Sequence, residues 1–169
     1  MLDLSIYCAG PISGLSYDEA MKVFTERVNI LSEIGFDVFY PMMGKEYLRN
    51  DIKLKAHGYE NHPSSSNHSI VGRDTWMIDQ SQIIFPDFSI QNNIKDIEKI
   101  KRVSIGSCCE IGYAYAKNKY IITVMNEENI HRHAFILEMS DIVFEKIQEA
   151  YDYLEKFKYL FEKKQITLN

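Results

Sequence analysis

The sequence predicts a doubly wound α/β fold in which helices flank a mostly parallel sheet of five strands. Short apolar runs alternate along the chain with longer segments whose apolar residues recur at helical spacing. The first 41 residues read as strand, helix and strand, which requires a parallel pair and a right-handed crossover. The expected arrangement is of the Rossmann or flavodoxin type, and such sheets bind ligands beyond the carboxyl ends of their strands.

The first unit has clear boundaries. A short apolar run over residues 4–9 is expected to be a buried strand, and a second run over 36–40 stops at a proline. Between them, Ser16 and Glu19 have the spacing of a capping box, and Gly35 stands where a helix C-cap is expected.

The middle of the chain is less regular. Residues 42–68 are polar, and we expect them to form a lid with a short helix near 47–55. Their histidines lack the spacing of metal ligands, so no metal site is predicted. Ser69 is expected to cap the next helix, which leads to a strand over 82–86.

The remaining elements follow in alternation. A glycine-containing loop enters an alanine-rich helix within residues 104–119, and an apolar run over 120–125 predicts the fourth strand. A short helix over 134–138, an edge strand over 142–144 and an amphipathic helix from residue 147 complete the prediction.

Composition limits the possible functions. A chain of 169 residues with 46% hydrophobic content suits one domain, 1–169. The net charge of -5 argues against a nucleic acid polymer as partner. No apolar stretch is long enough to span a membrane, and we expect a cytoplasmic protein. Cys8, Cys108 and Cys109 are expected to be reduced and buried.

The candidate site lies where loops meet the carboxyl ends of the strands. This rule brings Tyr7, Gly10 and Glu110 to one crevice, with Asp74 near it. Glu110 is expected in the first turn of its helix, where the macrodipole alone could account for an acid. At the mouth of a parallel sheet, however, a carboxylate can serve as nucleophile, base or ligand clamp. Asp74, next to Arg73, could equally belong to a solvated helix face.

Three segments carry a resemblance to a known family. They are Ile6-Tyr7-Cys8-Ala9-Gly10-Pro11, the pair Arg73-Asp74 before Ile83-Ile84-Phe85-Pro86, and Ser104-Ile105-Gly106-Ser107-Cys108-Cys109-Glu110-Ile111-Gly112-Tyr113-Ala114. Together they resemble the nucleoside 2-deoxyribosyltransferase family and the related 2'-deoxynucleoside 5'-monophosphate N-glycosidases. The likeness extends to about Met125, and the glutamate motif is its most specific part.

The resemblance implies a catalytic set. Glu110 would attack the anomeric carbon and form a glycosyl ester, Tyr7 would hold and polarise that carboxylate, and Asp74 would contact the base and manage its proton. This fits an oxocarbenium-like transition state served by two acids. The partners would be a small deoxynucleoside or deoxynucleotide and a free nucleobase, with no cofactor.

The resemblance also bears on whether the substrate carries a 5'-phosphate. A typical transferase has aspartates where this chain has Ser104 and Gln82, and a serine at the first position is similar to the monophosphate glycosidases. Losing that carboxylate removes its repulsion of a phosphate dianion. We expect further substrate contacts from the two strand-to-helix loops, at Ser13, Gly14, Gly106 and Ser107. Ser13 and Gly14 could instead serve only the turn.

The resemblance further implies a homo-oligomer with shared sites. His131 and His133 lie where a neighbouring subunit often completes the family's site, and either could contact a 5'-hydroxyl or phosphate. Three functions follow: deoxyribosyl transfer as the leading hypothesis, hydrolysis of a deoxynucleoside 5'-monophosphate as the next, and a non-catalytic nucleotide-binding module as the third.

Overall fold

The computed structural model describes residues 4–50, 53–55, 57, 64, 66–91 and 102–167. It contains a parallel sheet of five strands in the order β2-β1-β3-β4-β5, which confirms the predicted fold class. The strands are β1 (Ser5–Ala9), β2 (Asp37–Phe39), β3 (Ile83–Pro86), β4 (Tyr120–Val124) and β5 (Ile142–Phe144).

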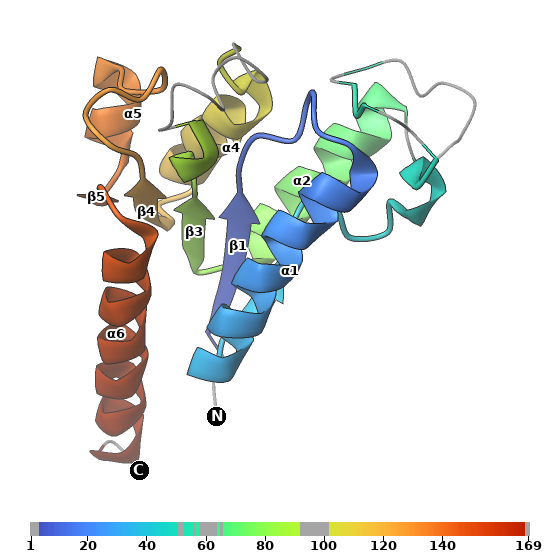
Figure 1. Cartoon of the computed structure of the whole chain (residues 1–169). Helices are drawn as coiled ribbons and strands as arrows, with labels where there is room; N and C mark the ends of the chain where they lie inside the picture. The colour runs from blue at the N-terminus through green and yellow to red at the C-terminus, as the bar shows by residue number, and fades with distance from the viewer. Residues whose placement is uncertain are drawn as a thin grey trace.

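Helices cover both faces of this sheet (Figure 1). One face packs against α1 (Tyr17–Ile34) and α6 (Ile147–Thr167). The other face packs against α2 (Asn67–Gln80), α4 (Ile105–Ala116) and α5 (Ala134–Met139). Short 3-10 turns stand at η1 (Glu46–Leu48) and η3 (Ser89–Gln91).

The alternation of side chains along β1 determines which layer each residue joins. Ile6 and Cys8 lie in the core cluster beneath α1 and α6. Tyr7 and Ala9 point to the opposite face and lie in the cluster beneath α2, α4 and α5. Tyr7 therefore points toward the same layer that carries Asp74 on α2 and Glu110 on α4.

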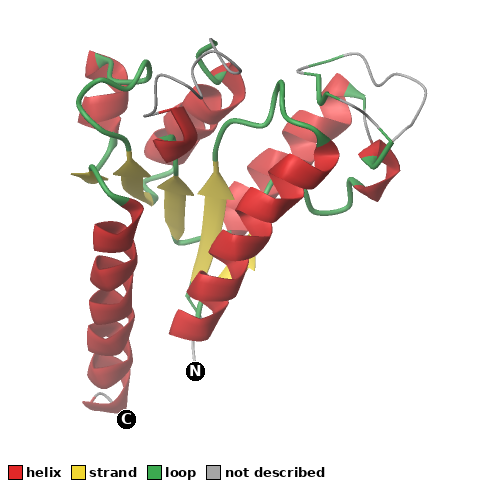
Figure 2. Ribbon diagram, viewed as in Figure 1, coloured by secondary structure: helices red, strands yellow, loops and turns green. Residues whose placement is uncertain are grey.

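The strand order places a switch point beside β1. The chain leaves β1 for β2 on one side and returns to β3 on the other, so the loops after β1 and β3 diverge. Figures 1 and 2 show the arrowheads of β1, β3 and β4 pointing to one end of the molecule, where the loops that follow these strands lie, and both termini at the opposite end. This loop end is where the site was expected.

The caps of the first helix are as predicted. Glu19 N donates to Ser16 Oγ over 3.2 Å, and Ser16 N donates to Glu19 Oε2 over 2.8 Å, which completes a capping box. Gly35 ends α1 with a φ of 103°. The predicted cap of α2 is wrong, because Ser66 Oγ accepts from Ser69 N and the helix begins three residues earlier.

The segment expected to be a lid differs in its local structure. The 3-10 helix η1 is a short helical piece at the start of the range 47–55, and it does not continue through the described residues of that range. Instead, Leu54 pairs with the first loop: its N–H donates to Leu15 O over 2.7 Å and its carbonyl accepts from Gly14 N over 2.9 Å. Other residues of this segment, His62 among them, lie outside the described residues.

The cysteines are free, but burial holds for only one of them. Cys8 is buried, Cys108 is partly buried and Cys109 is exposed on α4, so the prediction was wrong for Cys109. Within the described ranges, no helix is long and apolar enough to cross a bilayer.

Candidate active site

A hydrogen bond joins the first strand to the fourth helix at the centre of the site. Tyr7 Oη donates to Glu110 Oε1 over 2.8 Å. The Tyr7 side chain is fully buried, and its pKa is raised well above the usual value by burial and by the nearby Glu110 and Asp74 carboxyls. Tyr7 therefore stays protonated and acts as a fixed donor to Glu110.

Glu110 does not lie where the helix dipole would explain it. Helix α4 begins at Ile105, which puts Glu110 in the second turn and corrects the expectation of a first-turn acid. The dipole effect is largely confined to the first turn. Glu110 is partly buried beside Ser107 and Ile111, which are buried on the same helix. The helix dipole therefore does not explain why an acid stands at this partly buried position.

The pKa of the Glu110 carboxyl is shifted into the neutral range. Its pKa is raised to about 7, first by burial and then by the negative charge of Asp74, while Tyr7 and Lys45 act in the opposite direction. Near neutral pH both the proton-bearing and the ionised form are populated. Such shifted carboxyls are characteristic of catalytic sites.

Asp74 supplies a second acid from helix α2. Its side chain is largely buried, and Arg73 lies 3.4 Å from its Oδ1. Burial raises the pKa of Asp74, although Lys45 and Arg73 lower it in part. Because Met77 and Ile78 are buried one turn further along α2, Asp74 is on the inward face of the helix. The solvated-face alternative is therefore wrong for Asp74.

Lys45 is a residue of the site that the sequence analysis missed. It is only 7% exposed, and burial lowers its pKa while Asp74 and Glu110 raise it. A signal was present, because the loop after β2 also leaves a carboxyl end of the sheet.

These side chains line one cavity of about 1040 Å³. Lys45, Asp74 and Glu110 contribute to its wall, and the hydroxyl of Tyr7 reaches Glu110 from the strand below. The volume is ample for a nucleoside or nucleotide, since ligand sites commonly measure about 300 to 1,000 Å³.

The first loop lines the cavity, but its glycines have structural tasks. A Cβ at Gly10 would meet Asp87 O at 2.9 Å and Arg27 Nη1 at 3.1 Å, so this position requires glycine. Gly14 has a φ of 94°, and its N–H donates to Leu54 O rather than facing a ligand. The N–H of Gly14 therefore serves the turn, and both Gly14 and the exposed Ser13 line the cavity. Contact of either residue with a substrate stays a prediction.

The start of α4 forms another wall. Ser104, Gly106 and Ser107 all line the cavity, and the Oγ atoms of Ser104 and Ser107 lie 3.0 Å apart. Gln82, in contrast, lies just before β3 at the other end of the sheet, where its Oε1 accepts from Ser5 N over 2.8 Å.

His131 lies behind this wall and not in the cavity. Its Nε2 accepts from Ser104 N over 2.8 Å, its Nδ1 donates to Asn129 Oδ1 over 2.9 Å, and its ring stacks on Phe88 at 4.0 Å. Burial lowers its pKa to about 4, so it is neutral. Within one protomer His131 holds the backbone of Ser104 through this hydrogen bond.

His133 is also not among the residues that line the cavity. It caps α5, with Nδ1 accepting from Phe135 N over 3.3 Å. Phe135 is 70% exposed beside it. Contact of either histidine with the substrate of a neighbouring subunit stays a prediction.

Basic side chains surround the opening of the cavity on this acidic protein. Lys53, Lys55 and Arg102 line it from two segments far apart in the sequence. The sequence analysis assigned them no role, because isolated basic residues in irregular segments carry no periodic signal.

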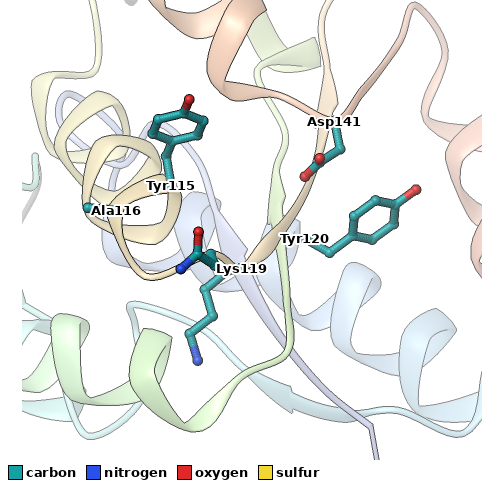
Figure 3. A pocket seen from close by; sticks show the side chains of 6 residues that line it. Tyr115, Ala116, Lys119, Tyr120 and Asp141 are labelled. Atoms are coloured by element: carbon teal, nitrogen blue, oxygen red, sulfur yellow. The ribbon is translucent and has the colours of Figure 1, made fainter.

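A smaller cavity of about 520 Å³ lies at the start of β4 (Figure 3). Its polar groups already have structural partners. Asp141 Oδ2 accepts from Ile121 N over 2.7 Å, and Lys119 Nζ donates to the carbonyls of Asp79 and Ser81. Nowhere in the described ranges do three or more metal-ligating side chains gather. The larger cavity is therefore the candidate active site.

The family model for nucleoside 2-deoxyribosyltransferase matches residues 6–169. The chain belongs to the nucleoside 2-deoxyribosyltransferase family. This family is enzymatic and transfers or hydrolyses glycosyl groups at N-glycosidic bonds. A comparison with curated protein sequences returned no match.

Solved structures show the same fold. A 2-deoxyribosyltransferase from Bacillus psychrosaccharolyticus has a TM-score of 0.56 and 20% identity, over 88% of this chain and 91% of that chain. A conserved protein from Enterococcus faecalis V583 has a TM-score of 0.55 and 15% identity, over 92% and 99%. A CMP N-glycosidase from Clostridium botulinum has a TM-score of 0.53 and 16% identity, over 90% and 98%.

Proposed function

We propose that the protein is a nucleoside 2-deoxyribosyltransferase, which cleaves the N-glycosidic bond of a 2'-deoxynucleoside and transfers the deoxyribose to another base. One observation carries the proposal. Glu110, held by the buried hydroxyl of Tyr7, lines the same cavity as a second acid, Asp74. A nucleophilic carboxylate with an acid beside it is what retaining glycosyl transfer requires.

In the first step Glu110 acts as the nucleophile. Tyr7 occupies Oε1, so the other oxygen attacks C1' of the deoxyribose. The C1'–N bond breaks, its electron pair goes to the base nitrogen, and a glycosyl ester forms on Glu110. Asp74, which lines the same cavity, gives a proton to the departing base.

In the second step the nitrogen of an incoming base attacks C1'. The ester bond breaks, Glu110 recovers its carboxylate, and the proton lost by the incoming base returns to Asp74. The configuration at C1' is retained, because two displacements follow each other. Water in place of the incoming base would give hydrolysis.

A second candidate is hydrolysis of a 2'-deoxynucleoside 5'-monophosphate. The observation that favours it is the wall at the start of α4, where the hydroxyls of Ser104 and Ser107 lie together and Arg102 also lines the cavity. Hydroxyls, a cation and the first amides of α4 are the groups that bind a phosphate. Chemistry at Glu110 would be the same in both candidates.

Product analysis tests these candidates. Purified protein is incubated with deoxynucleosides and, separately, with their 5'-monophosphates, each with and without a free acceptor base, and the products are separated by chromatography. A new deoxynucleoside that forms only with acceptor supports the transferase. Base and deoxyribose 5-phosphate released from the monophosphate alone support the hydrolase. Tight binding without turnover would overturn both and leave a non-catalytic binding module.

Glu110→Ala is the matched variant for that experiment, and Cys109→Ala is its control. Cys109 precedes Glu110 on α4 but is exposed. We expect the first variant to abolish product and the second to leave it unchanged.

Shared sites in a homo-oligomer are also part of the proposal. The exposed Phe135, stacked on His133, gives α5 an apolar surface that a second subunit could cover. Light scattering of the wild type and of Phe135→Ser tests this. A wild type that is monomeric at assay concentration would contradict it.

A further inference from the structure

We infer that Lys45 is a further catalytic residue: its ammonium group donates a hydrogen bond to the nucleobase as the base departs from C1'. This inference rests on the proposed function and deepens it, because it assigns the group that stabilises the leaving base.

Lys45 is an unusual lysine in this chain. It is 7% exposed, lines the cavity and takes part in none of the ion pairs found among the described residues. A buried ammonium normally has a close anionic partner, because its desolvation is costly. The nearby Asp74 and Glu110 offset part of that cost across the cavity.

Lys158 provides the contrast. It is 5% exposed, but its Nζ lies 3.5 Å from Glu162 Oε1 and 5.5 Å from the centre of the Phe36 ring. Structural contacts therefore account for this buried lysine. They do not account for Lys45, which lines the cavity and has no such ion pair among the described residues.

The backbone around Lys45 holds it in place. Lys45 N donates to Met42 O over 3.2 Å, and Leu48 N donates to Lys45 O over 2.9 Å. Met42 and Leu48 are buried in the core, and Gly44 supplies the positive φ of 70° that the turn requires. Lys45 is thus presented from an anchored turn, which a catalytic group needs.

The position of Lys45 assigns it to the base. Among the charges that act on the pKa of Lys45, Asp74 contributes most and raises it, Arg73 lowers it, and Glu110 raises it least. In the proposed reaction Asp74 serves the departing base, whereas Glu110 attacks the sugar. Because Lys45 and Asp74 line the same cavity, we assign Lys45 to the part of it that the base would occupy.

The chemistry of an ammonium suits this place. As the C1'–N bond breaks, its electron pair moves onto the base, and negative charge develops on a ring nitrogen or a carbonyl oxygen. Lys45 has three N–H donors and no acceptor, so it can only stabilise such charge. Asp74 delivers the proton, and Lys45 remains an ammonium throughout. A charge-assisted hydrogen bond in a buried site is stronger than one in water.

The test compares leaving groups within one variant. We measure kcat for base release from 2'-deoxyuridine and 5-fluoro-2'-deoxyuridine, or from 2'-deoxyadenosine and 2-fluoro-2'-deoxyadenosine, by wild type and Lys45→Met. Fluorine makes the base a better leaving group. We expect Lys45→Met to lower kcat about 100-fold for the parent base. For the fluorinated base, the factor by which kcat falls should be at least fivefold smaller.

The decisive readout is the ratio of kcat for the fluorinated base to kcat for the parent base, compared between each variant and the wild type. Partial misfolding scales both rates equally and leaves their ratio unchanged, and Lys45→Gln gives the same readout if Lys45→Met does not fold. Lys158→Met is the control for removing a buried lysine, and its ratio should equal that of the wild type.

Two results would overturn the inference, and they are distinguishable. In the first result the wild type is active, and its Lys45 variants lose the same factor of kcat with both members of a pair or change only KM. This result overturns the role of Lys45 alone. A wild type that releases no base from any of the four compounds or their 5'-monophosphates overturns the proposed function together with this inference.

Discussion

Tyr7 and Glu110 are 103 residues apart in the sequence, and the hydroxyl of the first lies 2.8 Å from the carboxylate of the second. The contact joins β1 to α4 at the carboxyl end of the sheet. Tyr7 is buried and keeps its proton, which it donates to the carboxylate of Glu110. In the proposed reaction Glu110 acts in its ionised form, so its protonation state leads to predictions about pH.

The first prediction concerns the pH profile of the wild type. Glu110 attacks as a carboxylate and its pKa is about 7, so kcat/KM should fall about tenfold per pH unit below that value. The measurement is kcat/KM for base release between pH 5 and 9. A profile that is flat down to pH 5 would contradict the role of Glu110.

The second prediction concerns Tyr7→Phe. The hydrogen bond from Tyr7 lowers the pKa of Glu110, so its loss should move the acid limb of the profile to higher pH. At pH 7 we expect kcat/KM to fall about tenfold, the value of one strong hydrogen bond. The control is Tyr113→Phe on α4, whose hydroxyl bonds Asp79 away from the cavity, and it should leave the limb in place.

The third prediction concerns Asp74→Asn, which should move the acid limb of the pH profile in the direction opposite to that of Tyr7→Phe. The charge of Asp74 raises the pKa of Glu110, so a neutral amide should shift the limb to lower pH. Because the proton donor is lost as well, kcat should fall about 100-fold. A limb that shifts upward in this variant would disprove the proposed coupling between the two acids.

The fourth prediction concerns stability. The pKa of Glu110 in the folded chain, about 7, is higher than its ordinary value of 4.5, so ionisation of Glu110 destabilises the fold as pH rises from 4.5 to 7. Glu110→Gln should therefore be more stable than wild type at pH 8, by on the order of 2 kcal/mol, and equal to it near pH 4. Urea unfolding at both pH values measures this. A variant less stable than wild type at pH 8 would be inconsistent with a strained carboxylate.

The fifth prediction concerns Gly10. An alanine Cβ there would lie 2.9 Å from the carbonyl of Asp87, which is backbone and cannot move aside easily. Gly10→Ala should therefore destabilise the fold by about 1 to 3 kcal/mol. Gly72→Ala is the control, because Gly72 lies within α2 with nothing within 4 Å, and should raise stability by up to about 1 kcal/mol. Equal effects in the two variants would refute the steric argument.

Local patterns explain which features of the fold and the site could be predicted from the sequence. The capping pair Ser16 and Glu19 and the end of α1 at Gly35 depend on local hydrogen bonds, which neighbouring residues determine. The position of Tyr7 follows from strand alternation together with the rule for parallel sheets. These local rules were sufficient to bring Tyr7, Asp74 and Glu110 to one end of the sheet.

Non-local contacts explain what the sequence did not predict. Lys45 is buried because its turn docks on the core through Met42 and Leu48, which no local pattern encodes. His131 supports Ser104 because the loop after β4 folds back on α4, a contact across 27 residues. The cap of α2 was misplaced because Ser66 and Ser69 both fit the pattern, and only the backbone conformation distinguishes them.

The most direct measurement is the mass of the protein after reaction with a slow substrate. A 2'-deoxy-2'-fluoronucleoside slows the second displacement, so a glycosyl ester should accumulate. We predict an added mass of one fluorinated deoxyribosyl group on the peptide that contains Glu110, and no such mass in Glu110→Gln. Release of base by the wild type with no adduct at any time, and continued release by Glu110→Gln, would contradict a glycosyl-enzyme at Glu110.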